Sequence, residues 1–390
     1  MNQTTATPKL WSKDFRLVIA VNFLVFTSMY MLLPTLPLYA QDISGRQSMA
    51  GLIVGIFTLA AVVIRPWIGN LLDNTGRKNI LLCGIAIFAV TTAAYSQISL
   101  IIVLLAVRLF QGIGWGATTT ATGTIASDVI PPERRAEGMA YFGMASTVAM
   151  SVGPAWGLYL IGYFGYASLF SLAAGLTILG MAAAWPINYE HHIPMAEKPA
   201  PRRIIIEKTA VIPSLVLLFV ALTYGGIVTF LPAYAAYREI TDIGMFFTTF
   251  ALALLLTRPL MGRAADKFSF SAVLLPGMVL LTAALLILLS ATSLTGFLLA
   301  AVLYGLGFGA VQPVLNAITV TLSPPDRRGA ANATFMSAMD TGIGLGAILW
   351  GFVAEQFGFI YIYGCSALFI CLALGLYLAL LHKKLPAKIN

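Results

Sequence analysis

Long apolar runs separated by short polar segments fill nearly the whole chain. A helix of about 20 apolar residues crosses the hydrocarbon core of a bilayer, which is about 30 Å thick. Twelve runs reach that length, at roughly residues 15–38, 49–72, 79–97, 99–127, 134–160, 163–187, 210–235, 241–265, 271–291, 293–322, 328–355 and 358–381. The pattern therefore predicts an all-α polytopic membrane protein with twelve transmembrane helices.

The connections between these runs are mostly very short, so neighbouring helices are expected to form antiparallel hairpins. The exception is 188–209, a polar segment that contains three prolines and four basic residues and falls near the midpoint of the chain. We expect it to link two six-helix bundles, residues 1–187 and 210–390. The segment is too short to hold an additional soluble domain.

The composition supports a membrane protein. The chain is 59% hydrophobic and only 10% charged, whereas soluble domains carry about 25% charged residues. The formal net charge of +8 comes from basic residues scattered between apolar runs, which argues against a nucleic-acid partner. Cys83, Cys365 and Cys371 all fall within apolar runs, and none has metal-ligand spacing, so they are expected to pack in the core.

The basic residues also predict the orientation of the bundle. Only Arg46 and Arg238 lie in one set of alternate connections. The other set holds eighteen: Lys9, Lys13, Arg16, Arg77, Lys78, Arg134, Arg135, Lys198, Arg202, Arg203, Lys208, Arg263, Lys267, Arg327, Arg328, Lys383, Lys384 and Lys388. Because cytoplasmic loops carry the excess of Lys and Arg, both termini and the linker are predicted to lie in the cytoplasm of a cell-membrane protein.

The two halves of the chain repeat one another at a constant offset of 193 positions. The matched segments are 65–73 with 258–266, 112–117 with 305–310, and 131–135 with 324–328. One gapless offset over so many helices indicates two parallel structural repeats, an architecture found in secondary transporters. The second copy lacks the Gly76–Arg77 pair that follows the first segment.

Three motifs resemble the major facilitator superfamily, and the resemblance extends over nearly the whole chain. Residues 69–78 resemble that family's motif between helices two and three, and residues 108–114 resemble its helix-four motif in proton-coupled members. Residues 153–157 are similar to the helix-five motif of drug–proton antiporters, although Ala149 and Leu158 stand where that motif often has glycine.

The resemblance implies a transporter rather than an enzyme, one that exports a small organic or drug-like compound in exchange for protons by alternating access. A proton symporter or facilitator for a polar metabolite, a lipid flippase and a non-transporting sensor remain alternatives. The chain has no G-x-x-x-x-G-K-[ST] loop, which argues against an ATP-driven pump. The expected partners are the substrate, protons and the lipid bilayer. We expect a monomer with no cofactor beyond the proton as coupling ion.

A cytoplasmic gate is predicted around the first motif. Gly69 permits close approach of another helix, and Asp73 is suited to meet the positive end of a helix dipole. The resemblance implies that this helix is the eleventh, across the bundle boundary, and that Arg77 pairs with Asp128. Asp266 is the repeat-related acid of Asp73. The alternative is a solvated loop whose charges only set the topology.

Asp340 is the candidate for proton coupling. It lies about 18 Å into the eleventh helix, near the middle of the bilayer, where a charged carboxylate is costly and too short to reach the interface. Burial favours the protonated form of a carboxyl group, so Asp340 could bind and release a proton as access alternates. Thr147 occupies the repeat-related position. A hydrogen-bonded structural aspartate is the alternative.

Three arginines lie away from the ends of their apolar runs. Arg108, about 13 Å deep in helix four, needs a carboxylate, carbonyls, water or an anionic substrate as a partner. The resemblance implies a role in proton coupling as the counterpart of Asp340, and a structural hydrogen-bond hub is the alternative. Arg65 and Arg258 are expected to extend their guanidinium groups to the cytoplasmic interface, with gate pairing as the alternative.

The resemblance also implies that helices one, four, seven and ten line a central cavity. Their polar residues are Asn22, Tyr30, Gln111, Tyr224, Gln312 and Asn316. Hydrogen bonds between helices would explain each of them equally well. Trp115 and Phe308, at matching positions, are expected to pack rather than to stack on a ligand. No metal site is expected, because His191 and His192 have no Cys or carboxylate at ligand spacing.

Overall fold

The computed structural model describes residues 10–131, 134–188, 206–267, 269–324 and 327–382, and it leaves out the side chains of 70, 73–75, 135–136, 140, 259, 262–267 and 329. The main helices are α1 (Lys13–Ser44), α2 (Gln47–Thr75), α3 (Arg77–Ala94), α4 (Ile101–Val129), α5 (Arg135–Ala184), α6 (Val211–Tyr237), α7 (Gly244–Lys267), α8 (Phe270–Ser290), α9 (Leu294–Leu322), α10 (Arg328–Phe357) and α11 (Phe359–Leu376). Short helical turns η1 (Tyr95–Gln97), η3 (Lys208–Ala210) and η5 (Tyr377–Leu381) extend three of them.

The element α5 contains two of the predicted helices. Its backbone leaves the helical region at Gly165, where φ is 76° and ψ is 175°. The repeat-related Gly358, with φ 99° and ψ 164°, separates α10 from α11 in the same way. A positive φ suits glycine, which has no Cβ. The twelve-helix prediction is therefore confirmed over the described residues.

Most of these helices are apolar enough to cross a membrane. Within the described residues, ten helical segments meet the length and hydropathy expected of a span, with the long α5 counted once, and Gly244–Arg258 is a shorter apolar helix. The short loops make each helix antiparallel to the next. We call the end where α1 begins and η5 finishes the terminal end, and the other the opposite end.

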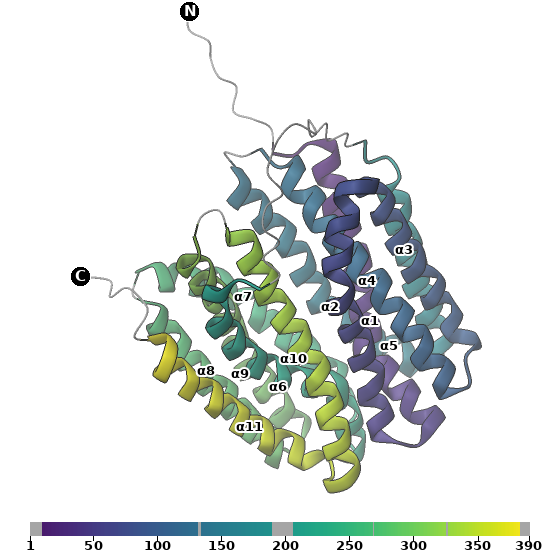
Figure 1. The fold of residues 1–390 in the computed structure, drawn as a ribbon. Helices are drawn as coiled ribbons and strands as arrows, with labels where there is room; N and C mark the ends of the chain where they lie inside the picture. The colour runs from purple at the N-terminus through teal and green to yellow at the C-terminus, as the bar shows by residue number, and fades with distance from the viewer. Residues whose placement is uncertain (1–9, 132–133, 189–205, 268, 325–326, 383–390) are drawn as a thin grey trace, which may run out of the picture.

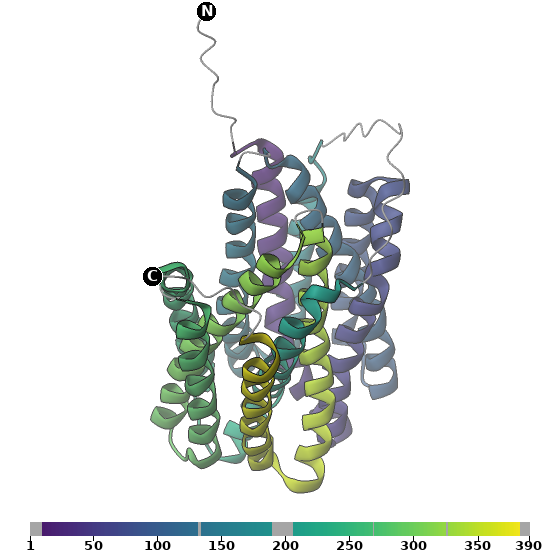
Figure 2. The ribbon, with the colours of Figure 1, turned by 60° about the vertical axis from the view of Figure 1, so that its left-hand side comes forward.

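The helices gather into two groups (Figures 1 and 2). In the first, α1 packs on α5, and α4 packs on α2 and α3. In the second, α6 packs on α10 and α11, and α9 packs on α7 and α8. Two further pairs, α2 with α10 and α5 with α7, join the groups. The linker boundaries at 188–209 stay a prediction, since 189–205 lie outside the described residues.

The repeat is visible in the packing itself. A Cβ on Gly114 would lie 2.9 Å from the carbonyl oxygen of Gly84, and one on Gly307 would lie 2.7 Å from that of Gly277. Both residues of the second contact are offset by 193 from those of the first. Such close approach requires small residues at the helix interface. The sequence repeat is thus a repeat of contacts.

The repeat-related aromatic residues pack in the two cores as predicted. Trp115 is 5% exposed, and its ring centroid lies 4.6 Å from that of Phe26. Phe308 is fully buried, with its ring centroid 5.1 Å from that of Tyr224 and 6.1 Å from that of Tyr304.

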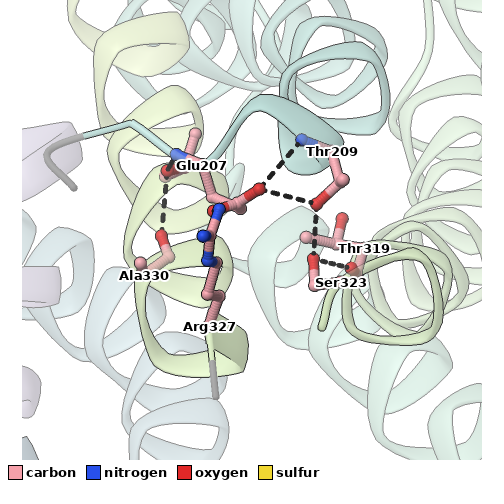
Figure 3. Close-up of polar contacts among 7 residues, drawn as sticks. Glu207, Thr209, Thr319, Ser323, Arg327 and Ala330 are labelled. Carbon is pink, nitrogen blue, oxygen red and sulfur yellow. Dashed lines mark hydrogen bonds and ion pairs between the residues drawn. The ribbon is translucent and has the colours of Figure 1, made fainter. Parts of the chain in front are cut away.

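A buried glutamate anchors the start of the second group at the terminal end (Figure 3). Glu207 is 3% exposed, and its Oε1 accepts hydrogen bonds from the backbone N–H of Thr209 at 3.3 Å and from its hydroxyl at 3.2 Å. The Arg327 guanidinium lies 3.9 Å from Oε2. Through Thr209, the glutamate also reaches Ser323 at the end of α9.

We predict that Glu207→Ala lowers the stability of the purified protein by about 1–3 kcal/mol, because it leaves buried donors without an acceptor. A lower apparent Tm in detergent would report the loss. The matched control is Asp14→Ala, at the repeat-related position, where the carboxylate is partly exposed and accepts a hydrogen bond from the backbone N–H of Asn188 at 3.2 Å. Equal shifts for the two variants would contradict the prediction.

Candidate functional site

An ion pair joins the two groups of helices at mid-depth. The Nη1 atom of Arg65 in α2 lies 2.5 Å from the Oδ2 atom of Asp340 in α10, and the two side chains are 22% and 26% exposed. The expectation that Arg65 extends to the interface is therefore wrong, and the alternative, pairing with a carboxylate, describes what the structure shows. Asp340 is too short to reach the membrane interface, and Arg65 on the facing helix comes to it instead.

Arg258 makes a second contact between the groups. Its Nη1 donates to the hydroxyl of Thr147 in α5, and its Nη2 donates to Oε1 of Gln312 in α9, at 3.2 Å. Its buried Nε has no hydrogen-bond partner among the described residues. The interface expectation is wrong here too, because the side chain points between the helices instead of toward the terminal end.

The two contacts are related by the sequence repeat. Arg65 and Arg258 are 193 positions apart, and so are Thr147 and Asp340. In each contact, an arginine of one half reaches a helix of the other half. Arg65 reaches α10, and Arg258 reaches α5. The chemistry is not symmetric, because one arginine meets a carboxylate and the other meets neutral oxygens.

Further predicted cavity residues surround these contacts. Tyr30 in α1 lies near both Asp340 and Arg258, and Tyr224 in α6 lies near Arg258 and Tyr30. Asn316 lies one helical turn beyond Gln312 in α9, and its buried Oδ1 has no hydrogen-bond partner within the described part of the chain. The structure therefore brings four predicted residues, Tyr30, Tyr224, Gln312 and Asn316, to the region of the two arginines.

Arg108 lies elsewhere, inside the first group. It is 1% exposed; its Nε donates to the carbonyl of Ile53 at 3.1 Å, and its Nη1 donates to Oε1 of Gln111 at 2.6 Å. The guanidinium carbon lies 4.0 Å from the ring centroid of Phe57. Within the described residues, no carboxylate lies within 4.0 Å of Arg108. Its predicted pairing with Asp340 is not what the structure shows, and the geometry is that of a structural hub.

Two other predicted cavity residues are also committed to internal hydrogen bonds. Gln111 is fully buried; its Oε1 accepts from Tyr95 at 2.5 Å and its Nε2 donates to Thr92 at 2.8 Å. Asn22 is 1% exposed and donates to the carbonyl of Phe142 at 3.1 Å. In this conformation the Gln111 side chain is fully used by its hydrogen bonds, whereas the buried Oδ1 of Asn22 has no hydrogen-bond partner among the described residues.

The predicted pair of Arg77 and Asp128 is present at the terminal end. The Nε of Arg77 lies 2.8 Å from Oδ2 of Asp128, and the side chains are 13% and 18% exposed. Arg77 begins α3 and Asp128 nearly ends α4, so each has the unfavourable sign for its helix dipole, and pairing offsets this. The side chains of Asp73 and Asp266 lie outside the described residues, and the gate itself stays a prediction.

At the opposite end, contacts between the groups join α2 to α10. The carboxylate of Glu355 in α10 accepts from Nε of Arg46 at 3.0 Å and from the backbone N–H of Ser48 at 2.9 Å, at the start of α2. A Cβ added to Gly51 would collide with the carbonyl of Ala347, and one on Gly344 with Thr58. The same face of α2 continues to Gly69, where an added Cβ would meet nothing within 4 Å. The two helices are in close contact at the opposite end, and the contact is lost at Gly69.

The comparisons with known proteins agree with this architecture. The family profile described as Major Facilitator Superfamily matches residues 18–241 and 214–390. The chain belongs to the Major Facilitator Superfamily, a family of multi-pass membrane transporters. An uncharacterised transporter of this type from Methanocaldococcus jannaschii is 24% identical over 375 residues, which is 92% of this chain and 94% of that protein. The staphylopine export protein of Staphylococcus aureus is 23% identical over 346 residues, covering 84% and 86%.

Solved structures show the same fold. A mutant of the nucleoside transporter NupG superposes with a TM-score of 0.79 at 15% identity, covering 94% of this chain and all of that one (100%). The human organic anion transporter MFSD10 gives a TM-score of 0.69 at 18% identity, covering 95% and 100%. At these identities the likeness concerns the fold alone.

We predict that Gly51→Ala and Gly69→Ala have opposite effects on the stability of the protein: the first lowers it and the second raises it. The methyl group at 51 must displace the α10 backbone, at a cost of roughly 1–3 kcal/mol. At 69 the added methyl meets open space, and alanine favours the helix by up to about 1 kcal/mol. The apparent Tm of the purified variants measures the difference. A Gly69→Ala variant as destabilised as Gly51→Ala would show that α2 and α10 are in close contact along their whole length.

Proposed function

We propose that the protein exports a small organic compound in exchange for protons, and that Asp340 carries the proton. The observation that carries the proposal is the ion pair of Arg65 and Asp340, which lies between α2 of one half and α10 of the other. In an alternating-access transporter the two halves move against each other around a central site. A titratable group on their boundary can bias that movement.

The chemistry follows from the charge of the carboxylate. When Asp340 is ionised, it pairs with Arg65 and favours the conformation closed at the opposite end. When it binds a proton, the attraction is lost and Arg65 is released. Removing one partner of a buried ion pair costs about 3–5 kcal/mol. A surface ion pair contributes only about 0–1 kcal/mol, and since about a quarter of each side chain is exposed here, the attraction lost on protonation lies between these two limits.

The direction of transport rests on two further observations. The excess of basic residues at the terminal end supports a cytoplasmic location for that end, so the conformation described here is closed toward the outside. Among the relatives, the staphylopine export protein is named as an exporter. With the ion pair formed, the ionised protein is open toward the cytoplasm, where an exporter loads its substrate, and a proton that binds Asp340 removes the attraction that holds this conformation.

We predict that Asp340→Asn abolishes proton-driven exchange. The amide keeps the shape of the side chain and cannot titrate, so transport becomes independent of the pH gradient. The assay uses inverted, energised membrane vesicles with a fluorescent pH indicator and a compound found by screening the wild type. We expect compound-induced proton efflux to fall at least tenfold, while counterflow of the labelled compound continues.

The control is Asp42→Asn. Asp42 lies at the opposite end, where it accepts a hydrogen bond from Tyr166 at 2.8 Å, and it has no place in the proposed coupling. An Asp340→Asn variant with the same proton efflux as wild type would remove Asp340 from the coupling role.

A further inference from the structure

We propose that the transported compound carries an anionic group, such as a carboxylate, and that Arg258 binds it. This inference rests on the proposed function, in that it takes the region between the two halves as the transport site. Beyond the proposed function, it specifies the charge of the substrate and names Arg258 as the residue that recognises that charge.

The two repeat-related arginines occupy equivalent positions, but only one of them has a carboxylate as its partner. Asp340 neutralises Arg65 at 2.5 Å. Arg258 has Thr147 and Gln312 as its hydrogen-bond partners, both neutral. Within the described residues, no carboxylate lies within 4.0 Å of Arg258. A cation at membrane depth is costly without an anion or a full set of acceptors, and the buried Nε of Arg258 has neither.

Arg108 shows what a purely structural arginine looks like in this fold. It is also without a carboxylate, but a carbonyl, a glutamine and an aromatic ring surround it, and it is 1% exposed. Arg258 is only partly buried, lies between the two halves and leaves one donor unused. Of the two, Arg258 therefore has the access and the donor capacity that an anionic ligand needs.

The surroundings of Arg258 suit an organic anion better than an inorganic one. Tyr30 and Tyr224 are its titratable neighbours, and both carry a hydroxyl donor on an aromatic ring. The Tyr224 ring stacks on Phe308, with centroids 5.1 Å apart. Guanidinium groups bind carboxylates through two parallel hydrogen bonds. An organic anion whose carboxylate binds Arg258 would match the site, while Tyr224 and Phe308, which are 2% and 0% exposed, belong to the packed core.

The inference predicts that the protein selects ligands by charge when shape is held constant. Benzoate, benzamide and benzamidinium have nearly the same shape and differ in charge, so they form a matched set of probes. Purified protein in detergent is titrated with each at constant ionic strength, and the apparent Tm is recorded. We expect saturable stabilisation by benzoate, a weaker effect of benzamide, and none from benzamidinium.

Two variants test the assignment to Arg258. Arg258→Gln should weaken benzoate binding at least tenfold. Thr147→Asp retains the arginine and supplies it with an internal carboxylate, so it should weaken benzoate binding as well, even if Arg258→Gln folds poorly. Arg238→Gln, which removes a cation at the opposite end that contacts Tyr234, is the control and should bind benzoate like the wild type.

Several results would overturn the inference: no stabilisation by benzoate, equal or stronger stabilisation by benzamidinium, or unchanged benzoate binding in both Arg258→Gln and Thr147→Asp. Each of these can occur while compound-induced proton efflux in vesicles is intact, which would leave the proposed function standing. Conversely, charge-selective benzoate binding with no proton coupling would contradict the proposed function and support the anion site.

Discussion

The arrangement of the two halves depends on one contact, the ion pair of Arg65 and Asp340. It places the full charge of a carboxylate on the boundary between α2 and α10, the pair of helices that also approach most closely through Gly51 and Gly344. Neither residue has another oppositely charged partner within 4.0 Å in the described part of the chain. Because the partners belong to different halves, the proposed mechanism links the protonation state of Asp340 to the relative position of the halves.

The repeat explains both where this contact lies and why it is asymmetric. Duplication of one unit places an arginine at 65 and 258, and a helix-facing position at 147 and 340, so it builds two equivalent contacts between the halves. One has kept or gained the acid, and the other has threonine. In the proposed mechanism this single difference gives the two contacts different functions. The contact of Arg65 with Asp340 responds to protons, and the contact of Arg258 with Thr147 leaves a cation that can bind the substrate.

The sequence was sufficient for the fold but only partly for the site. The apolar runs predicted the twelve helices, and the offset of 193 predicted two structural repeats. The family resemblance predicted the pair of Arg77 and Asp128. The partner of Asp340 was not predicted. Hydropathy gives only the approximate depth of a residue along the membrane normal and says nothing of its angular position around the helix. Arg65 was expected to reach the cytoplasmic interface, so Arg108 was named as the counterpart of Asp340 instead. The offset relates Arg65 to Arg258 and Thr147 to Asp340. A two-fold repeat requires a contact between Arg65 and position 340 to be matched by one between Arg258 and position 147, so considering the four positions together would have found both contacts.

The central claim is that the charge asymmetry between positions 147 and 340 decides which arginine is coupled to the proton. Exchanging the two residues, as Thr147→Asp with Asp340→Thr, tests it most directly in the vesicle assay of proton efflux. The account predicts that Asp340→Thr alone abolishes proton coupling and that the exchanged protein recovers a substantial part of it, because the new carboxylate meets Arg258 across the same boundary. An exchanged protein that is folded, and no better coupled than Asp340→Thr, would contradict the account.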